Sequence, residues 1–143
     1  MDQTSESTRL PARMENLNRL MEWILDFLRE KGFPEERIQD IELASEEALV
    51  NIIRHGFPDR EPGEVTIRCR GETDDSVEIE FSDDGVPFDP ASMAQPDLHL
   101  PIEDRRVGGL GVFLIRRLIN EVRYRRDGGR NILTWMVHKQ RGG

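Results

Sequence analysis

Three short polar clusters in the sequence combine residue types that could hold a phosphorylated ligand and act on it. Glu47 and Asn51 stand four residues apart, Asp83-Asp84-Gly85 follows, and Gly108-Gly109-Leu110-Gly111 comes last. A carboxylate can orient or deprotonate a hydroxyl group, and an amide oxygen is a ligand that suits Mg2+. Backbone N–H groups at a glycine-rich helix start can hold phosphate oxygens. Together the clusters predict a nucleotide pocket, although none of them is specific alone.

The first pair is predicted to lie on a helix over residues 34–54. Pro34 fixes a φ angle that suits a first helical turn, and apolar residues then recur at helical spacing. At about 100° per residue, Glu47 and Asn51 lie within roughly 40° of each other on that helix, beside its apolar stripe. Taken alone, the pair also fits an ordinary solvated helix face, because this spacing is common.

Asp83 is predicted to end a strand with its side chain turned toward the core. Residues 64–70 and 76–82 alternate apolar and polar side chains around a turn, which predicts a hairpin. The same period of two places Asp83 on the apolar side, where an unpaired carboxylate is costly. A ligand amino group, such as the exocyclic amine of adenine, would satisfy it, and Gly85 would leave room for a flat base. The alternative for Asp-Asp-Gly alone is an ordinary turn.

The glycine cluster at 108–111 opens a stretch with helical spacing over residues 109–120. The N–H groups of such a helix start favour phosphate binding without a basic side chain. Neither G-x-x-x-x-G-K-[ST] nor G-x-G-x-x-G occurs in the chain, which excludes the P-loop and dinucleotide-binding patterns. The alternative for an isolated glycine run is a simple chain break before a helix.

The remaining segments predict helices laid on a sheet. A helix is expected over residues 13–31, a short edge strand near Arg9 and Leu10, and two final strands around Asp127-Gly128-Gly129. This element order favours an α+β, two-layer α/β sandwich with helices on one face of a mixed, mainly antiparallel sheet. Residues 86–107 carry four prolines and little periodicity, and a loop of that length is usually functional, so we expect a lid there.

The bulk composition limits the classes of protein that fit. The 143 residues suit one domain, which we place at 9–139, with a disordered N-terminus at 1–8 and a tail at 140–143. A formal net charge of −8 argues against nucleic-acid binding, because a polyanion would be repelled. The single Cys69 allows no internal disulfide, and the chain shows neither a leader pattern nor a membrane-length apolar run. We therefore expect a cytoplasmic protein that has no membrane partner.

In combination, the three clusters resemble the sequence boxes of a known ATPase family. The segment Glu47-Ala48-Leu49-Val50-Asn51 resembles the N box of the GHKL (Bergerat-fold) ATPases. The segment from Asp83 to Pro90 resembles their first glycine box, and Gly109-Leu110-Gly111 resembles the second. The resemblance covers residues 9–139 and is carried by the order and spacing of the boxes. The chain looks most like the stand-alone branch, the anti-sigma factor serine kinases of the partner-switching type.

The resemblance implies roles for individual residues. Glu47 would act as a base or position a water molecule, Asn51 would hold Mg2+, and Asp83 would bind the N6 amine of adenine. The glycines Gly85, Gly109 and Gly111 would shape the base and phosphate site, to which the backbone of Gly108 and Leu110 is also expected to contribute. Arg105 and Arg106 are similar in place to lid arginines that meet the phosphates or the partner, and Thr134 resembles a position near the adenine.

The resemblance also implies an activity and partners. The expected protein uses ATP and Mg2+ to phosphorylate a serine or threonine of a small anti-anti-sigma (STAS-like) protein, and otherwise sequesters a sigma factor. A homodimer is expected from the family. Pro87 is a departure, because many members carry a second glycine there. Two alternatives stay open: an ATP-gated switch that phosphorylates nothing, and a structural domain that binds no nucleotide.

Overall fold

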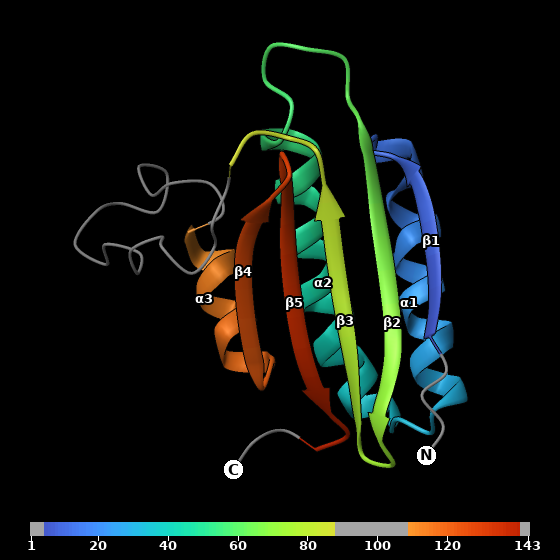
Figure 1. Cartoon of the computed structure of the whole chain (residues 1–143). Helices are drawn as coiled ribbons and strands as arrows, with labels where there is room; N and C mark the ends of the chain where they lie inside the picture. The colour runs from blue at the N-terminus through green and yellow to red at the C-terminus, as the bar shows by residue number, and fades with distance from the viewer. Residues whose placement is uncertain (1–4, 88–108, 141–143) are drawn as a thin grey trace, which may run out of the picture.

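A computed structural model describes residues 5–87 and 109–140 of the chain (Figure 1). Its elements follow in the order β1 (Ser5–Pro11), a 3-10 turn (Met14–Asn16), α1 (Leu17–Glu30), α2 (Glu35–His55), β2 (Glu64–Thr73), β3 (Ser76–Asp83), α3 (Gly109–Leu118), β4 (Glu121–Asp127) and β5 (Arg130–His138).

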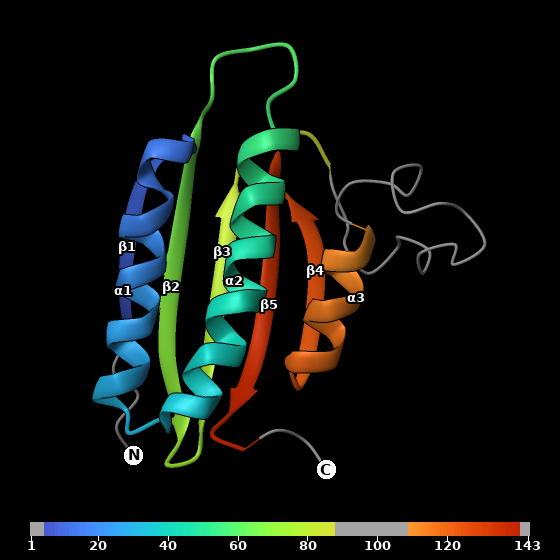
Figure 2. The same cartoon turned by 180° about the vertical axis from the view of Figure 1, so that it is seen from behind.

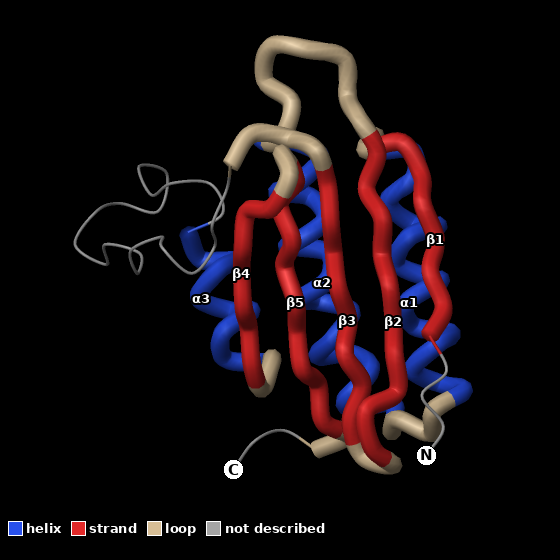
Figure 3. Tube along the Cα trace, viewed as in Figure 1, coloured by secondary structure: helices blue, strands red, loops and turns tan. Residues whose placement is uncertain are grey.

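The five strands form one sheet in the order β1-β2-β3-β5-β4, and every neighbouring pair is antiparallel. Helices α1, α2 and α3 lie on one face of this sheet, and the described parts of the chain place no helix on the other face (Figures 2 and 3). The expected α+β sandwich is confirmed, with a sheet that is antiparallel throughout its described strands instead of mixed. Because α3 and β4 separate β3 from β5 in sequence, the central pairing joins distant segments.

The helix boundaries follow the local signals in the sequence. Pro34 is the N-cap of α2 in extended conformation, and Glu35 and Glu36 in the first turn suit the positive end of the helix dipole. Helix α1 stops before Gly32, whose φ of 84° lies in the left-handed region that favours glycine. Both helices therefore begin and end within a few residues of the predicted positions.

The core lies between the helices and the sheet. Apolar side chains at alternate positions of β2, β3 and β5 meet the apolar stripes of α1 and α2. At its centre, Phe81 and Trp135 pack edge to face with ring centroids 4.7 Å apart. Cys69 is buried in the same cluster, and burial raises the pKa of its thiol, as suits a small core residue.

The first strand begins closer to the N-terminus than expected. Strand β1 starts at Ser5, which pairs with Arg70 of β2, so the predicted disorder of residues 1–8 is wrong for 5–8. Main-chain hydrogen bonds to β2 hold this polar segment, and they leave no hydrophobic signal in the sequence. Of the expected lid at 86–107, only Val86 and Pro87 are among the described residues. Within the described residues, no helix has both the length and the apolar character needed to cross a membrane.

Candidate functional site

A small pocket opens between α2 and the sheet, near the end of the sheet where β3 finishes. Four elements besides β3 contribute to it, because α2, α3, β4 and β5 all reach this end. Its free volume is about 30 Å³, and its polar groups stand among apolar walls. The lining residues are Ala48, Asn51, Ile52, Gly56, Asp83, Ile115, Tyr124, Asn131 and Leu133.

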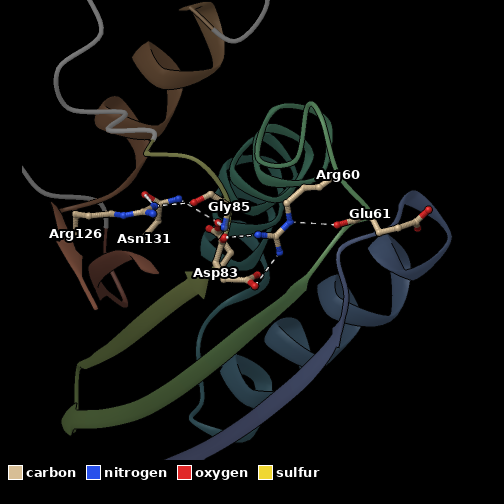
Figure 4. Close-up of polar contacts among 7 residues, drawn as sticks. Arg60, Glu61, Asp83, Gly85, Arg126 and Asn131 are labelled. Atoms are coloured by element: carbon tan, nitrogen blue, oxygen red, sulfur yellow. Dashed lines mark hydrogen bonds and ion pairs between the residues drawn. The ribbon is translucent and has the colours of Figure 1, made fainter. Parts of the chain in front are cut away.

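Asp83 lies at the floor of this pocket. Its side chain is only 3% exposed, which confirms the inward orientation predicted from the strand period. One carboxylate oxygen, Oδ1, accepts hydrogen bonds from the Gly85 N–H at 2.8 Å and from Asn131 Nδ2 at 3.0 Å (Figure 4). The other oxygen, Oδ2, has no hydrogen-bond partner among the described residues. A strong acceptor is therefore left for a donor that enters the pocket.

Burial raises the pKa of the Asp83 carboxyl above its ordinary value of 3.8, and the hydrogen bonds from Asn131 and Gly85 oppose this shift only in part. A carboxyl whose pKa is raised by folding stabilises the fold when protonated, and this contribution is lost as pH rises through the raised pKa. At neutral pH the ionised Asp83 therefore costs folding free energy, in the absence of a ligand that donates to it.

This cost leads to a pH-dependent prediction. Without nucleotide, we expect Asp83→Asn to melt at a higher temperature than the wild type at pH 7, because the amide avoids burying a charge. The difference in Tm should shrink as pH is lowered through the raised pKa of the wild-type carboxyl, because the protonated acid buries no charge. Paired thermal melts across this range measure it, and all other titrating groups cancel in the difference. A gap in Tm that is independent of pH would contradict the prediction.

Asn131 links Asp83 to the last hairpin. It is 6% exposed, and its Nδ2 also donates to the Val86 carbonyl at 2.8 Å. Its Oδ1 accepts from the Tyr124 hydroxyl at 2.6 Å and from Arg126 at 3.1 Å. These contacts fix which end of the Asn131 amide faces Asp83, so that Asp83 receives a donor. Asn131 was not among the residues predicted for the site, although its place in the apolar period of the last strand was an available signal.

Thr134 is not part of the pocket. The burial pattern of β5 alternates, and Asn131, Leu133 and Trp135 turn toward the helices. Thr134 therefore points to the opposite face of the sheet, beside Glu80 in the register. The expected place of Thr134 at the site is corrected on this ground, because the pocket is lined from β5 by Asn131 and Leu133 and not by Thr134.

Asn51 and Glu47 stand on α2 as predicted, one turn apart. Asn51 is 5% exposed, lines the pocket, and makes no side-chain hydrogen bond to any described residue. Its amide oxygen is a hard ligand that suits Mg2+, which takes one or two protein ligands together with phosphate oxygens. No group of three His, Cys, Asp or Glu side chains in the described residues could hold a metal alone. Glu47 is half-buried and stands outside the pocket lining.

Gly85 is required by a close backbone approach. A Cβ atom placed there would stand 2.5 Å from the Gly56 carbonyl oxygen and 2.9 Å from Asp83 Oδ1. The Val86 N–H donates to the same Gly56 carbonyl at 2.8 Å, which joins the end of α2 to the end of β3. The space that was expected beside Gly85 for a flat base is thus filled by the Gly56 backbone.

We therefore expect Gly85→Ala to destabilise the fold by about 2–3 kcal/mol, because the Gly56 backbone and the Asp83 carboxylate must shift to admit the methyl group. Denaturant unfolding measures the change. Gly128→Asn is the matched control, since nothing lies within 4 Å of its Cβ position and asparagine tolerates the φ of 59°. Equal stabilities of the two variants would show that the contact at Gly85 yields easily.

Asp84, next to Asp83, has a different environment. Its Oδ2 accepts from Arg60 at 2.9 Å, and this hydrogen bond is the main cause that lowers the pKa of the Asp84 carboxyl. The Arg60 guanidinium also lies over the Phe57 ring, 5.1 Å from its centroid. Figure 4 shows Arg60 and Asn131 reaching this region from opposite sides. Asp84 thus fastens the loop after α2, whereas Asp83 faces the pocket.

Helix α3 begins within the glycine cluster at 108–111. Gly109, Leu110 and Gly111 form its first turn, and α3 packs against α2 with its start toward the end of the molecule that holds the pocket (Figure 2). Ile115 of the same helix lines the pocket. Gly108, Arg105 and Arg106 lie outside the described residues. The structure therefore brings Asn51, Asp83 and the start of α3 to one end of the sandwich.

Comparisons with known proteins agree with this arrangement. The family model of the histidine kinase-like ATPase domain matches residues 10–137. The serine-protein kinase RsbW of Listeria monocytogenes serovar 1/2a is 34% identical over 131 residues, which is 87% of this chain and 82% of the relative. The serine-protein kinase RsbW of Bacillus cereus strain G9842 is 30% identical over 129 residues, which is 87% of this chain and 79% of the relative.

A solved structure supports the fold. The RsbU and RsbW domains of a Mycobacterium tuberculosis protein superpose with a TM-score of 0.66 at 18% identity, covering 94% of this chain and 32% of that one. The match to the family model spans most of the chain and contains all three boxes of the GHKL resemblance. This chain belongs to the histidine kinase-like ATPase domain family.

Proposed function

We propose that this protein is an ATP-dependent kinase that phosphorylates a serine or threonine of a small anti-anti-sigma (STAS-like) protein. The observation that carries the proposal is the buried Asp83, which lines an apolar pocket beside Asn51. Neither Asp83 Oδ2 nor the Asn51 side chain has a hydrogen-bond partner in the part of the chain that the structure describes. The relatives named serine-protein kinase RsbW support the choice of reaction.

In this proposal the pocket holds the adenine ring. Asp83 Oδ2 accepts a hydrogen bond from the N6 amine, and Ile52, Ile115 and Leu133 contact the faces of the ring. A volume of about 30 Å³ holds roughly one water molecule, so the pocket walls must separate to admit a base. Binding would then relieve the cost of the buried carboxylate, which gives the site a direct energetic preference for a ligand with a donor at that position.

The phosphates would extend from the pocket toward α3. The N–H groups of the first turn of α3, at Gly109 to Gly111, would hold phosphate oxygens, and Gly108 and Arg105 are proposed to contribute from outside the described residues. Asn51 would hold Mg2+ through its amide oxygen, and the ion would neutralise charge on the phosphates.

Glu47 would position and finally deprotonate the acceptor hydroxyl. It lies one helical turn from Asn51, about 6 Å along the axis of α2, so its carboxylate can face a hydroxyl held at the γ-phosphate. The oxygen–phosphorus bond to the acceptor forms as the bond between the γ-phosphorus and the bridging oxygen of ADP breaks. The hydroxyl proton passes to Glu47 late in this exchange, and most of the rate comes from positioning and charge neutralisation.

The partners belong to the same proposal. When it is not phosphorylating the STAS-like protein, the kinase would sequester a sigma factor, and it would act as a homodimer in the cytoplasm. The test combines purified protein, γ-labelled ATP with Mg2+, and a STAS-domain partner with its acceptor residue intact or replaced by alanine. We expect label on the intact partner only. ATP binding with no label on any partner would favour a non-catalytic switch, and the absence of ATP binding would overturn the proposal.

A further inference from the structure

A buried arginine at the end of the molecule away from the pocket makes an unusual set of contacts. Arg37, in the first turn of α2, is 2% exposed. Its Nη1 donates to the Leu118 carbonyl at 2.6 Å, its Nη2 to Asn120 Oδ1 at 2.7 Å, and its Nε to the His138 carbonyl at 2.8 Å. Asp40 pairs with the same guanidinium at 3.1 Å. One side chain therefore joins α2 to the end of α3, to the turn that follows it, and to the end of β5.

The position of Arg37 in the first turn of α2 does not explain why a positively charged residue stands there. The first turn of a helix favours acidic residues, which α2 has at Glu35 and Glu36, and a cation there opposes the helix dipole. Burying a charge costs further free energy, which the Asp40 pair and the three acceptors offset. The guanidinium does suit the C-terminal end of α3, because the last carbonyls of a helix lack intrahelical donors and attract a cation.

The contact at Leu118 matters because it fixes one end of a short helix. Helix α3 has ten residues and is about 15 Å long, and its other end carries Gly109 to Gly111. A short rigid helix that is held at its C-terminal end against α2 presents its first-turn N–H groups in a defined place. Arg37 and Asn51 are fourteen residues apart on α2, which is about 21 Å along the helix, so Arg37 itself cannot touch a nucleotide.

We propose that Arg37 is a positioning residue for phosphate binding: it clamps the C-terminal end of α3 so that the N-terminal end meets the phosphates of ATP. This inference rests on the proposed function. It predicts a loss that is larger at the phosphate end of the ligand. That end depends on the start of α3, whereas the adenine end depends mainly on Asp83 and α2 and takes Ile115 from α3.

The test compares ATP with adenosine, which has the base and sugar but no phosphates. In Arg37→Met, we expect the affinity for Mg-ATP to fall at least tenfold while the affinity for adenosine falls less than about threefold, because α3 contributes Ile115 to the base pocket. Calorimetry measures both affinities. Asn120→Ala keeps the charge pair and removes the acceptor that Arg37 shares with the His138 N–H, so a smaller loss in the same direction is expected. This variant decides the question if Arg37→Met does not fold.

The control separates positioning from general destabilisation. Leu25→Ala removes core volume in α1, away from α3, and should leave the ratio of the two affinities unchanged. Amide hydrogen exchange gives a readout without nucleotide: α3 should lose protection in Arg37→Met, and α1 should keep it. The inference would be overturned if the ratio of ATP affinity to adenosine affinity stayed unchanged in both Arg37→Met and Asn120→Ala. Unchanged protection of α3 would also overturn it. If the wild type binds no ATP while α3 still loosens in the variant, the proposed function fails and the clamp stands.

Discussion

Asp83→Asn is expected to weaken Mg-ATP binding by about 100-fold or more while the fold is kept. The asparagine oxygen can still accept from the Gly85 N–H and from Asn131, but its NH2 group then faces the pocket in place of Oδ2. A donor would thus meet the donor N6 amine of adenine. Losing a hydrogen bond to a charged acceptor and placing two donors together costs about 3 kcal/mol, which corresponds to roughly 100-fold in affinity.

Calorimetric titration of Mg-ATP measures this loss, and thermal melts without ligand report on the fold. The neighbouring Asp84→Asn is the matched control, because Asp84 pairs with Arg60 and is not among the residues that line the pocket. It should bind ATP within about threefold of the wild type, because an exposed ion pair contributes less than about 1 kcal/mol. Equal ATP affinity of Asp83→Asn and Asp84→Asn would mean that the base binds elsewhere.

Glu47→Ala should lower the rate of phosphoryl transfer by about 10²- to 10⁴-fold, the usual contribution of a positioned base. ATP affinity should change little, because Glu47 lies outside the lining of the pocket. Single-turnover transfer from labelled ATP to the STAS-domain partner measures the rate, with the nucleotide affinity determined separately. The combination of retained binding and lost transfer identifies a role in the chemical step.

The matched control is the adjacent glutamate. Glu46 is exposed and points about 100° away from Glu47 around α2. Glu46→Ala removes the same charge from the same helix, so a general electrostatic effect on ATP or on the partner would appear in both variants. Similar transfer rates in the two variants would remove Glu47 from the mechanism. Loss of transfer in both would point to a docking role for this acidic surface.

The local features of the fold could be predicted from the sequence. The elements of the sandwich were predicted from helix periodicity, from Pro34 and Gly32, and from the alternation in the strands. The period of two alone predicted that the Asp83 side chain points inward. These features depend on neighbours in sequence, because each side chain's direction follows from its position in its own element. The inward direction of the Asp83 carboxylate was therefore predictable before its surroundings were known.

The features that depend on strand pairing could not be predicted in this way. Asn131 meets Asp83 because β3 pairs with β5 and not with β4, and local periodicity does not give strand order. The error at Thr134 has the same origin: a resemblance placed the residue near the site, and only the register shows which face it occupies. The sequence does not distinguish Arg37 from the other charged residues of α2, because its contacts come from the ends of α3 and β5.

The pairing of β3 with β5 also sets when the pocket can exist during synthesis. Asp83 and Asn131 are 48 residues apart, and the whole of α3 and β4 must be made before they meet. Closing so long a segment before any contact is gained slows folding, and until β5 is made β3 has only β2 as a sheet neighbour among the described strands. A nascent chain that ends before β5 therefore lacks the Asn131 contact to Asp83, and we expect the proposed nucleotide site to be complete only in the finished chain.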